Sequence, residues 1–61
     1  MYAIVFNKSY LHTDGKFYNA FISMRGCHPK LYKSVKAAEK KALELSRRGG
    51  VSVNVERLPL N

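Results

Sequence analysis

Two runs of β-branched and aromatic residues dominate the first half of the chain. They cover residues 2–10 and 16–24, and each is predominantly hydrophobic. Asp14 and Gly15 lie between the runs, and an Asp-Gly pair supplies the positive φ angles that a tight hairpin turn requires. The pattern therefore predicts two antiparallel strands joined as a β-hairpin.

A helix is predicted over residues 35–48. Ser34 precedes it and is a residue type that caps helix N-termini, and the segment that follows is rich in Ala, Lys, Glu and Leu. Gly49 and Gly50 come directly after the segment, and glycine is the residue most often found where a helix ends. The helix is expected to begin and end at these signals.

Hydrophobic and polar residues alternate over residues 51–58, which is typical of a strand with one buried face. Residues 25–29 contain a glycine and a proline that interrupt regular structure. Residues 30–33 could form a short additional edge strand before the helix.

These elements follow one another as β-β-α-β, which predicts an α+β fold of two layers in a single domain over residues 1–61. We expect an antiparallel three-stranded sheet in the order 2-1-3, with the last strand beside the first and the helix on one face. The helix would bury a stripe formed by Val35, Ala38, Ala42 and Leu45. This stripe would meet Val51, Val53 and Val55, and residues 59–61 would form a tail.

Composition limits what such a chain can do. It has 61 residues, so it can bury only one thin core, and its hydrophobic content of 46% is too high for a disordered segment. Its one cysteine excludes an internal disulfide and fits a reducing, cytoplasmic setting. No hydrophobic run is long enough to span a membrane, and the first residues read as a strand rather than a signal peptide.

Positive charge changes this picture most. Eleven lysines and arginines stand against four acidic residues, which gives a formal net charge of +7. Such a charge favours a polyanionic partner, although a solvated helix face is the alternative. Most of the cations lie in the loop before the helix and on the helix itself. The candidate binding residues are Arg25, Lys30, Lys33, Lys36, Lys40, Lys41 and Arg47.

The sheet supplies a second candidate surface. Both alternating sets of side chains in the first two runs contain hydrophobic residues, and one helix covers only one face. We therefore expect exposed aromatic side chains on the other face, with Phe17, Tyr18 and Phe21 as candidates for stacking on unpaired bases. Pairing of two copies through this face and coverage by loops are the alternatives.

The sequence shows no catalytic constellation. The four carboxylates form no recognisable pair. Cys27 and His28 are adjacent, but neighbours in sequence rarely present their side chains to each other. A metal site from these two residues and His12 would lack a fourth ligand. We therefore expect no enzyme activity, no metal and no cofactor.

Three resemblances accompany these patterns. Residues 32–43, with Ser34, Ala38 and Glu39, resemble the strand-to-helix junction of double-stranded-RNA-binding domains. That resemblance implies phosphate contacts by Lys33, Lys36, Lys40 and Lys41. Residues 15–22 and the helix after them resemble the arm-type DNA-binding domain of tyrosine integrases, in which three strands precede the helix. The β-β-α-β outline is similar to that of small phage-encoded inhibitors of host RNA polymerase.

Three functional hypotheses follow. The leading one is a non-catalytic module that contacts the phosphates of DNA or RNA through its helix and the preceding loop. The alternative is a small inhibitor or adaptor, encoded by a phage or another mobile element, that binds an acidic surface of a host protein. A structural subunit of a larger assembly is the third.

Overall fold

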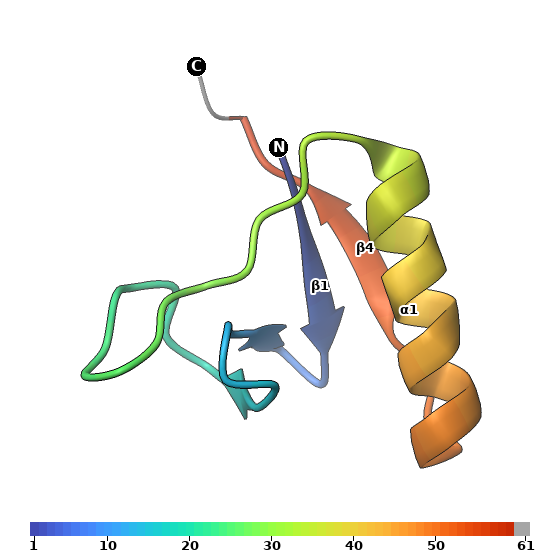
Figure 1. Ribbon diagram of the computed structural model, residues 1–61, viewed down its shortest axis with the longest axis horizontal. Helices are drawn as coiled ribbons and strands as arrows, with labels where there is room; N and C mark the ends of the chain where they lie inside the picture. The colour runs from blue at the N-terminus through green and yellow to red at the C-terminus, as the bar shows by residue number, and fades with distance from the viewer. Residues whose placement is uncertain (60–61) are drawn as a thin grey trace.

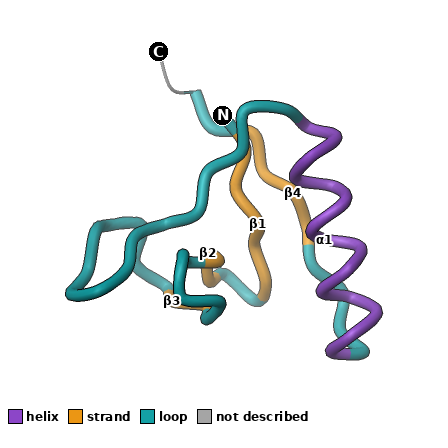
Figure 2. Tube along the Cα trace, viewed as in Figure 1, coloured by secondary structure: helices purple, strands orange, loops and turns teal. Residues whose placement is uncertain are grey.

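The computed structural model describes residues 1–59, which form an antiparallel sheet of four strands with one helix (Figures 1 and 2). The elements are β1 (Tyr2–Phe6), β2 (Ser9–Leu11), β3 (Phe17–Tyr18), α1 (Val35–Gly49) and β4 (Asn54–Arg57). The sheet order is β3-β2-β1-β4, so the last strand lies beside the first, as predicted. The α+β class with one helix is confirmed, and residues 60–61 of the predicted tail lie outside the described residues.

The predicted first strand, residues 2–10, is two strands. Asn7 and Lys8 have φ angles of 49° and 66° and turn the chain between β1 and β2. Phe6 and Ser9 are paired across this turn, and positive φ at both central residues is the requirement of a two-residue hairpin turn. Asparagine tolerates this conformation, whereas lysine adopts it rarely. The prediction of one continuous strand was wrong because no glycine in residues 2–10 indicates a turn.

The predicted second strand, residues 16–24, is also shorter than expected. Only Phe17–Tyr18 pairs with β2, across the turn that contains Gly15 with its φ of 85°. The hairpin around Asp14 and Gly15 is thus confirmed, but its second strand ends early. Residues 19–34 then form a long loop that passes back beside β1 to the start of the helix (Figure 1).

The additional edge strand expected at residues 30–33 is present only as isolated bridges. Tyr2 and Tyr32 exchange two backbone hydrogen bonds of 2.9 Å, and His12 forms a bridge with Pro29. Proline has no backbone N–H group, so a continuous ladder cannot run through it. The segment around Tyr32 pairs with the beginning of β1, at Tyr2, whereas β2 pairs with the end of β1, at Val5 and Phe6. The segment therefore does not form the predicted edge strand.

Both ends of α1 follow from the sequence. The Ser34 side chain accepts a hydrogen bond of 3.2 Å from the Ala37 N–H group. Gly50 adopts the left-handed conformation and donates its N–H group to Ser46 O at 2.9 Å. The helix extends one residue beyond the predicted end. Strand β4 begins only at Asn54, because the preceding residues carry the chain from the helix to the sheet.

The core lies between α1 and the sheet. Its buried members are Ile4, Leu11 and Ala42, and the partly buried side chains packed against them are Phe17, Tyr32, Leu45, Val53 and Val55. Ala38 is fully buried as predicted, whereas Val35 is 41% exposed and Val51 is 39% exposed. These two valines lie just inside and just beyond the ends of the helix, so neither reaches the sheet.

The opposite face of the sheet is more buried than the sequence predicted. Ala3 and His12, which lie on that face by strand alternation, are each only 1% exposed. Phe21 leaves the sheet direction and packs edge-to-face on Tyr10, with ring centroids 4.9 Å apart. Much of this face is therefore buried, although Phe21, Ile22 and Met24 of the loop are 37%, 63% and 39% exposed. Stacking or pairing of two copies through this surface stays a prediction.

Candidate functional site

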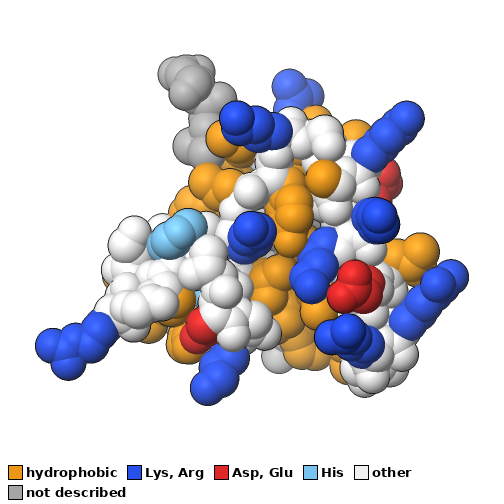
Figure 3. Space-filling view, in the orientation of Figure 1, with side chains coloured by type: hydrophobic (Ala, Val, Ile, Leu, Met, Phe, Trp, Pro, Cys, Tyr) orange, Lys and Arg blue, Asp and Glu red, His pale blue; other side chains and the backbone are white. Residues whose placement is uncertain are grey.

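On the face shown in Figure 3, blue Lys and Arg side chains, with red acidic side chains among them, lie around an exposed band of hydrophobic side chains. Because α1 packs mainly on β1 and β4, a space remains between the helix and the turn that follows β2. A cleft of about 290 Å³ occupies this space. Its lining is Leu11, His12, Thr13, Gly15, Lys30, Tyr32, Lys41, Leu45 and Arg48.

Three cations from two elements meet in this cleft. Lys41 and Arg48 are two turns apart on the same flank of α1, and Lys30 comes from the long loop. The Lys30 Nζ atom lies 5.8 Å from the centre of the Tyr32 ring, which forms part of the floor. None of the lining residues carries a carboxylate. The cleft is therefore a positively charged depression whose lining also includes Leu11, Tyr32 and Leu45.

Glu44 lies beside the two helix cations. Its Oε1 atom is 3.5 Å from Lys41 Nζ and 3.9 Å from Arg48 Nη2. Long, solvent-exposed ion pairs of this kind contribute little energy. The single carboxylate of Glu44 is thus shared between Lys41 and Arg48 in two long ion pairs. Both cations therefore retain the capacity to bind an anion.

The backbone of the turn contributes shape more than hydrogen-bond donors. The Thr13 N–H group donates to His28 O at 2.9 Å, and the Gly15 N–H group donates to His12 O at 3.0 Å. These two N–H groups are thus already used within the protein. The Thr13 hydroxyl oxygen accepts a hydrogen bond from the His28 N–H group, so its proton can point into the cleft. Anion binding here would depend on side chains.

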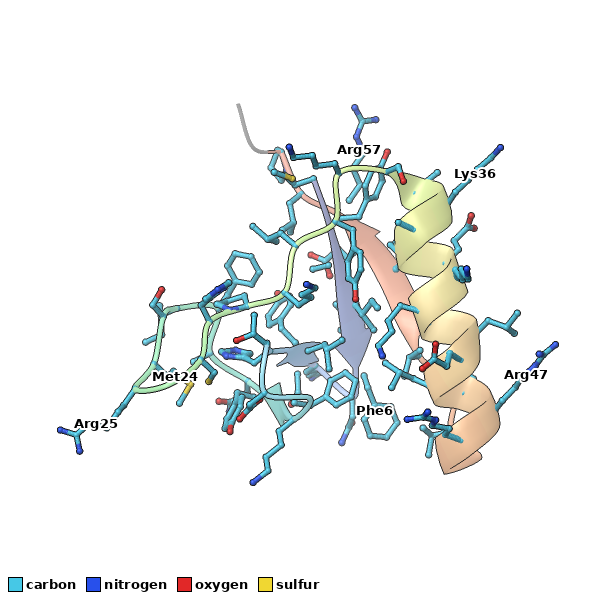
Figure 4. The ribbon with its side chains drawn as sticks, in the orientation of Figure 1. Phe6, Met24, Arg25, Lys36, Arg47 and Arg57 are labelled. Carbon is cyan, nitrogen blue, oxygen red and sulfur yellow. The ribbon has the colours of Figure 1, made fainter. Side chains whose placement is uncertain are left out.

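The other predicted cations do not form one patch with the cleft. Lys36 and Arg47 project from the outer side of α1 at opposite ends, and Arg25 lies at the tip of the long loop, far from the helix (Figure 4). Lys40 and Arg47 line a second depression together with Leu43, Glu44 and Arg48. Arg48 therefore connects the cleft to the outer helix face, whereas Arg25 stands apart from it.

Arg48, Thr13 and Tyr32 were absent from the predicted site. Arg48 could have been found, because Lys41 and Arg48 lie on one face at helical spacing. The parts played by Thr13 and Tyr32 depend on the path of the long loop, which no local pattern indicated. Of the predicted set, Lys30 and Lys41 line the cleft, while Lys33 and Lys36 are exposed near the helix N-terminus.

The aromatic candidates are largely engaged within the protein. Phe17 lies on the helix side of the sheet and packs edge-to-face on Phe6, with centroids 5.8 Å apart. The Tyr18 hydroxyl donates to Asp14 Oδ2 at 2.6 Å, and this bond raises the pKa of Tyr18 to about 12. Phe21 is 37% exposed and rests on Tyr10. None of the three presents a free ring face in the cationic cleft.

Cys27 and His12, rather than Cys27 and His28, are brought together. The Cys27 Sγ atom lies 3.4 Å from His12 Nδ1, and His12 Nε2 lies 3.0 Å from the Ala20 carbonyl oxygen. A carbonyl oxygen only accepts, so Nε2 carries a proton and, in the neutral ring, Nδ1 accepts from the thiol. Burial, followed by the charge of Asp14, raises the pKa of the Cys27 thiol. A raised pKa is the opposite of what a nucleophilic cysteine requires.

Metal binding is not indicated in the described part of the chain. Within residues 1–59, no three or more His, Cys, Asp or Glu side chains gather closely enough to hold an ion. His28 Nδ1 lies 3.0 Å from the carbonyl oxygen of Pro29, apart from the His12 and Cys27 pair.

Comparison with known proteins gives no assignment: no protein family, curated protein or solved structure matches this chain. No helix within residues 1–59 combines the length and the hydrophobicity needed to cross a bilayer.

Proposed function

We propose that this protein is a non-catalytic module that binds the phosphates of a nucleic acid through the cationic cleft and the adjoining face of α1. The observation that carries the proposal is the convergence of Lys30, Lys41 and Arg48 on a depression whose lining contains no carboxylate. Lysine and arginine side chains are among the principal groups that contact phosphates in nucleic-acid complexes.

The contact would extend from the cleft across the C-terminal half of the helix. Arg48 borders both depressions, and Lys40 and Arg47 continue the cationic surface beyond it. A phosphate backbone has regularly repeated charges, so it can occupy both depressions at once. A small isolated anion would use only one of them.

Base recognition forms no part of this proposal. The candidate stacking residues are held by Phe6, Asp14 and Tyr10 within the fold. Phosphate contacts alone carry no sequence information. Binding is therefore expected to be independent of sequence and to favour duplexes, whose charge density exceeds that of single strands.

The direct test uses purified, nuclease-treated protein with labelled duplex DNA, duplex RNA and single strands over a salt series. We expect the logarithm of the association constant to fall linearly with the logarithm of salt concentration, with a slope of about −0.9 per phosphate contacted in a duplex. Absence of binding above low salt would contradict the proposal. The acidic surface of a host protein would then be the ligand to test.

A further inference from the structure

Strand β4 is an edge strand, and half of its backbone hydrogen-bonding groups point away from the sheet. Tyr2 exchanges both of its backbone hydrogen bonds with Tyr32, on the side of β1 remote from β4. Successive residues of a strand direct their N–H and C=O groups to opposite sides of the strand. Ala3, which follows Tyr2, therefore directs its N–H and C=O groups toward its partner Glu56 in β4. The same alternation leaves the N–H and C=O groups of Val55 and Arg57 at the outer edge.

A groove of about 400 Å³ runs between this edge and α1. Its lining is Glu39, Ala42, Leu43, Ser46, Val53, Asn54 and Val55. These residues include no lysine or arginine, although cations occupy much of the remaining helix surface. Leu43 is 53% exposed beside the groove, and the exposed Val35 and Val51 lie near the two ends of the helix.

We propose that a second copy of this chain fills the groove by pairing its β4 antiparallel to the first around a two-fold axis. Pairing centred on Val55 sets Asn54 opposite Glu56 and Val53 opposite Arg57, so no like charges face each other. Centring on Glu56 would instead oppose two carboxylates, which is unfavourable in a strand pair. The two four-stranded sheets would become one continuous sheet.

Helix positions fit the same arrangement. Because α1 contacts both β1 and β4, it lies near the open edge of the sheet. Pairing along that edge would place the second copy's α1 on the same side of the joined sheet, beside the first. Packed helices lie roughly 8–10 Å apart. The two helices would therefore touch along the flank that carries Leu43.

Charge complementarity supports a second copy as the occupant. In an antiparallel helix pair centred on Leu43, Glu39 of each copy faces Arg47 of the other. The same symmetry brings the exposed Val35 of one copy near the exposed Val51 of the other. The cationic cleft lies on the opposite flank of α1, so this pairing leaves the cleft itself open. The pairing uses Leu43 and Arg47, which also line the second depression, so in the dimer only the cleft part of the proposed phosphate contact stays accessible.

Analytical ultracentrifugation of the nuclease-treated full chain tests the proposal. The wild type should show a mass twice the 6.9 kDa of one chain at high protein concentration, and dissociate on dilution. Glu39→Arg should raise the dissociation constant about tenfold or more, because it sets two cations against each other at two symmetry-related places in the dimer. Adding Arg47→Glu should restore pairing, since the charges are then exchanged. Glu39 and Arg47 are two turns apart in one helix, so this rescue would not arise within one copy.

A backbone variant tests the strand edge. Arg57→Pro removes an N–H group that points outward, which an edge strand tolerates. This variant should remain folded by circular dichroism and lose dimer, whereas the control Arg57→Ala should retain it. A monomer at all concentrations would overturn the proposal. A dimer that is insensitive to both Glu39→Arg and Arg57→Pro would overturn it as well.

Discussion

The Sγ atom of Cys27 lies 3.4 Å from Nδ1 of His12, and this contact joins the β2–β3 hairpin to the long loop. The imidazole is only 1% exposed, and its other nitrogen lies 3.0 Å from the Ala20 carbonyl oxygen. The ring of Tyr18 packs on it edge-to-face at 4.6 Å. His12 therefore holds three parts of the loop region through one buried ring.

His12→Ala should destabilise the fold. It leaves the Ala20 carbonyl and the Cys27 thiol without their partner, and each buried polar group left unpaired costs about 1–3 kcal/mol. Urea denaturation measures the loss. His28→Ala is the matched control: His28 is exposed, and its removal should change the unfolding free energy by about 0.5 kcal/mol or less. Equal effects of the two variants would contradict a structural role for His12.

The Cys27 thiol should react slowly in the folded protein. Burial and the nearby Asp14 carboxylate raise its pKa, so little thiolate is present at neutral pH. Alkylation by iodoacetamide at pH 8, followed by mass spectrometry, should be slower by about tenfold or more than in urea, because access and thiolate content both fall. Faster alkylation of the folded chain would instead indicate an activated cysteine and argue against a purely binding role.

The hydrogen bond between Tyr18 and Asp14 should appear in the pH dependence of stability. It lowers the pKa of Asp14, so its contribution is present above the ordinary Asp range near ~3.9 and is lost as the pH falls below it. The same hydrogen bond raises the pKa of Tyr18 to about 12. Its contribution to stability is therefore fully present below pH ~10 and is lost as the pH rises from there through about 12.

Absorbance at 295 nm can follow this tyrosine directly. One phenol should ionise near pH 12 in the wild type, and Asp14→Asn should bring its pKa down toward ~10. Burial also raises the pKa of Tyr32, so the test concerns the transition near pH 12 alone, which Tyr18→Phe should abolish. A late transition that persists in Tyr18→Phe would assign it to another tyrosine and contradict the interpretation.

The turn between β1 and β2 should gain stability from glycine. Lys8 has a φ of 66°, a conformation that costs a side-chain-bearing residue about 1–2 kcal/mol. Lys8→Gly creates an Asn-Gly turn, and it should raise the unfolding free energy by about 0.5–1 kcal/mol after the added freedom of the unfolded chain is counted. Lys8→Gln removes the same charge without relieving the backbone and should show no gain. A loss of stability in Lys8→Gly would contradict the assigned turn.

Local signals predicted the parts of the fold that depend on local chemistry. Ser34 and Gly50 mark the two ends of the helix, and both are observed as caps. The Asp14-Gly15 pair predicted the hairpin turn, and the alternation before Leu58 predicted the final strand. These features depend on capping, turn geometry and side-chain period, which sequence reveals directly.

The remaining errors come from long-range contacts. Residues 19–24 have the composition of a strand, yet they leave the sheet, and His12 and Tyr10 hold them across its face. The turn at Asn7 and Lys8 forms because the strands on both sides can pair, which outweighs the cost at lysine.

The same limit applies to the candidate site. Lys41 and Arg48 could be grouped from helical spacing, but only the path of the loop brings Lys30 beside them. Arg25, although close to Lys30 in sequence, is carried to the far end of the loop (Figure 4).

The most direct test of the cleft compares the salt dependence of duplex binding in two double variants of equal net charge. Lys41→Gln with Arg48→Gln removes two cleft cations, whereas Lys8→Gln with Arg57→Gln removes two cations outside the cleft lining. The account predicts that the cleft variant binds more weakly and that its salt slope is smaller by about 2 in magnitude, while the control keeps a slope near that of the wild type. Equal slopes in the two variants would show that net charge, and not the cleft, holds the nucleic acid.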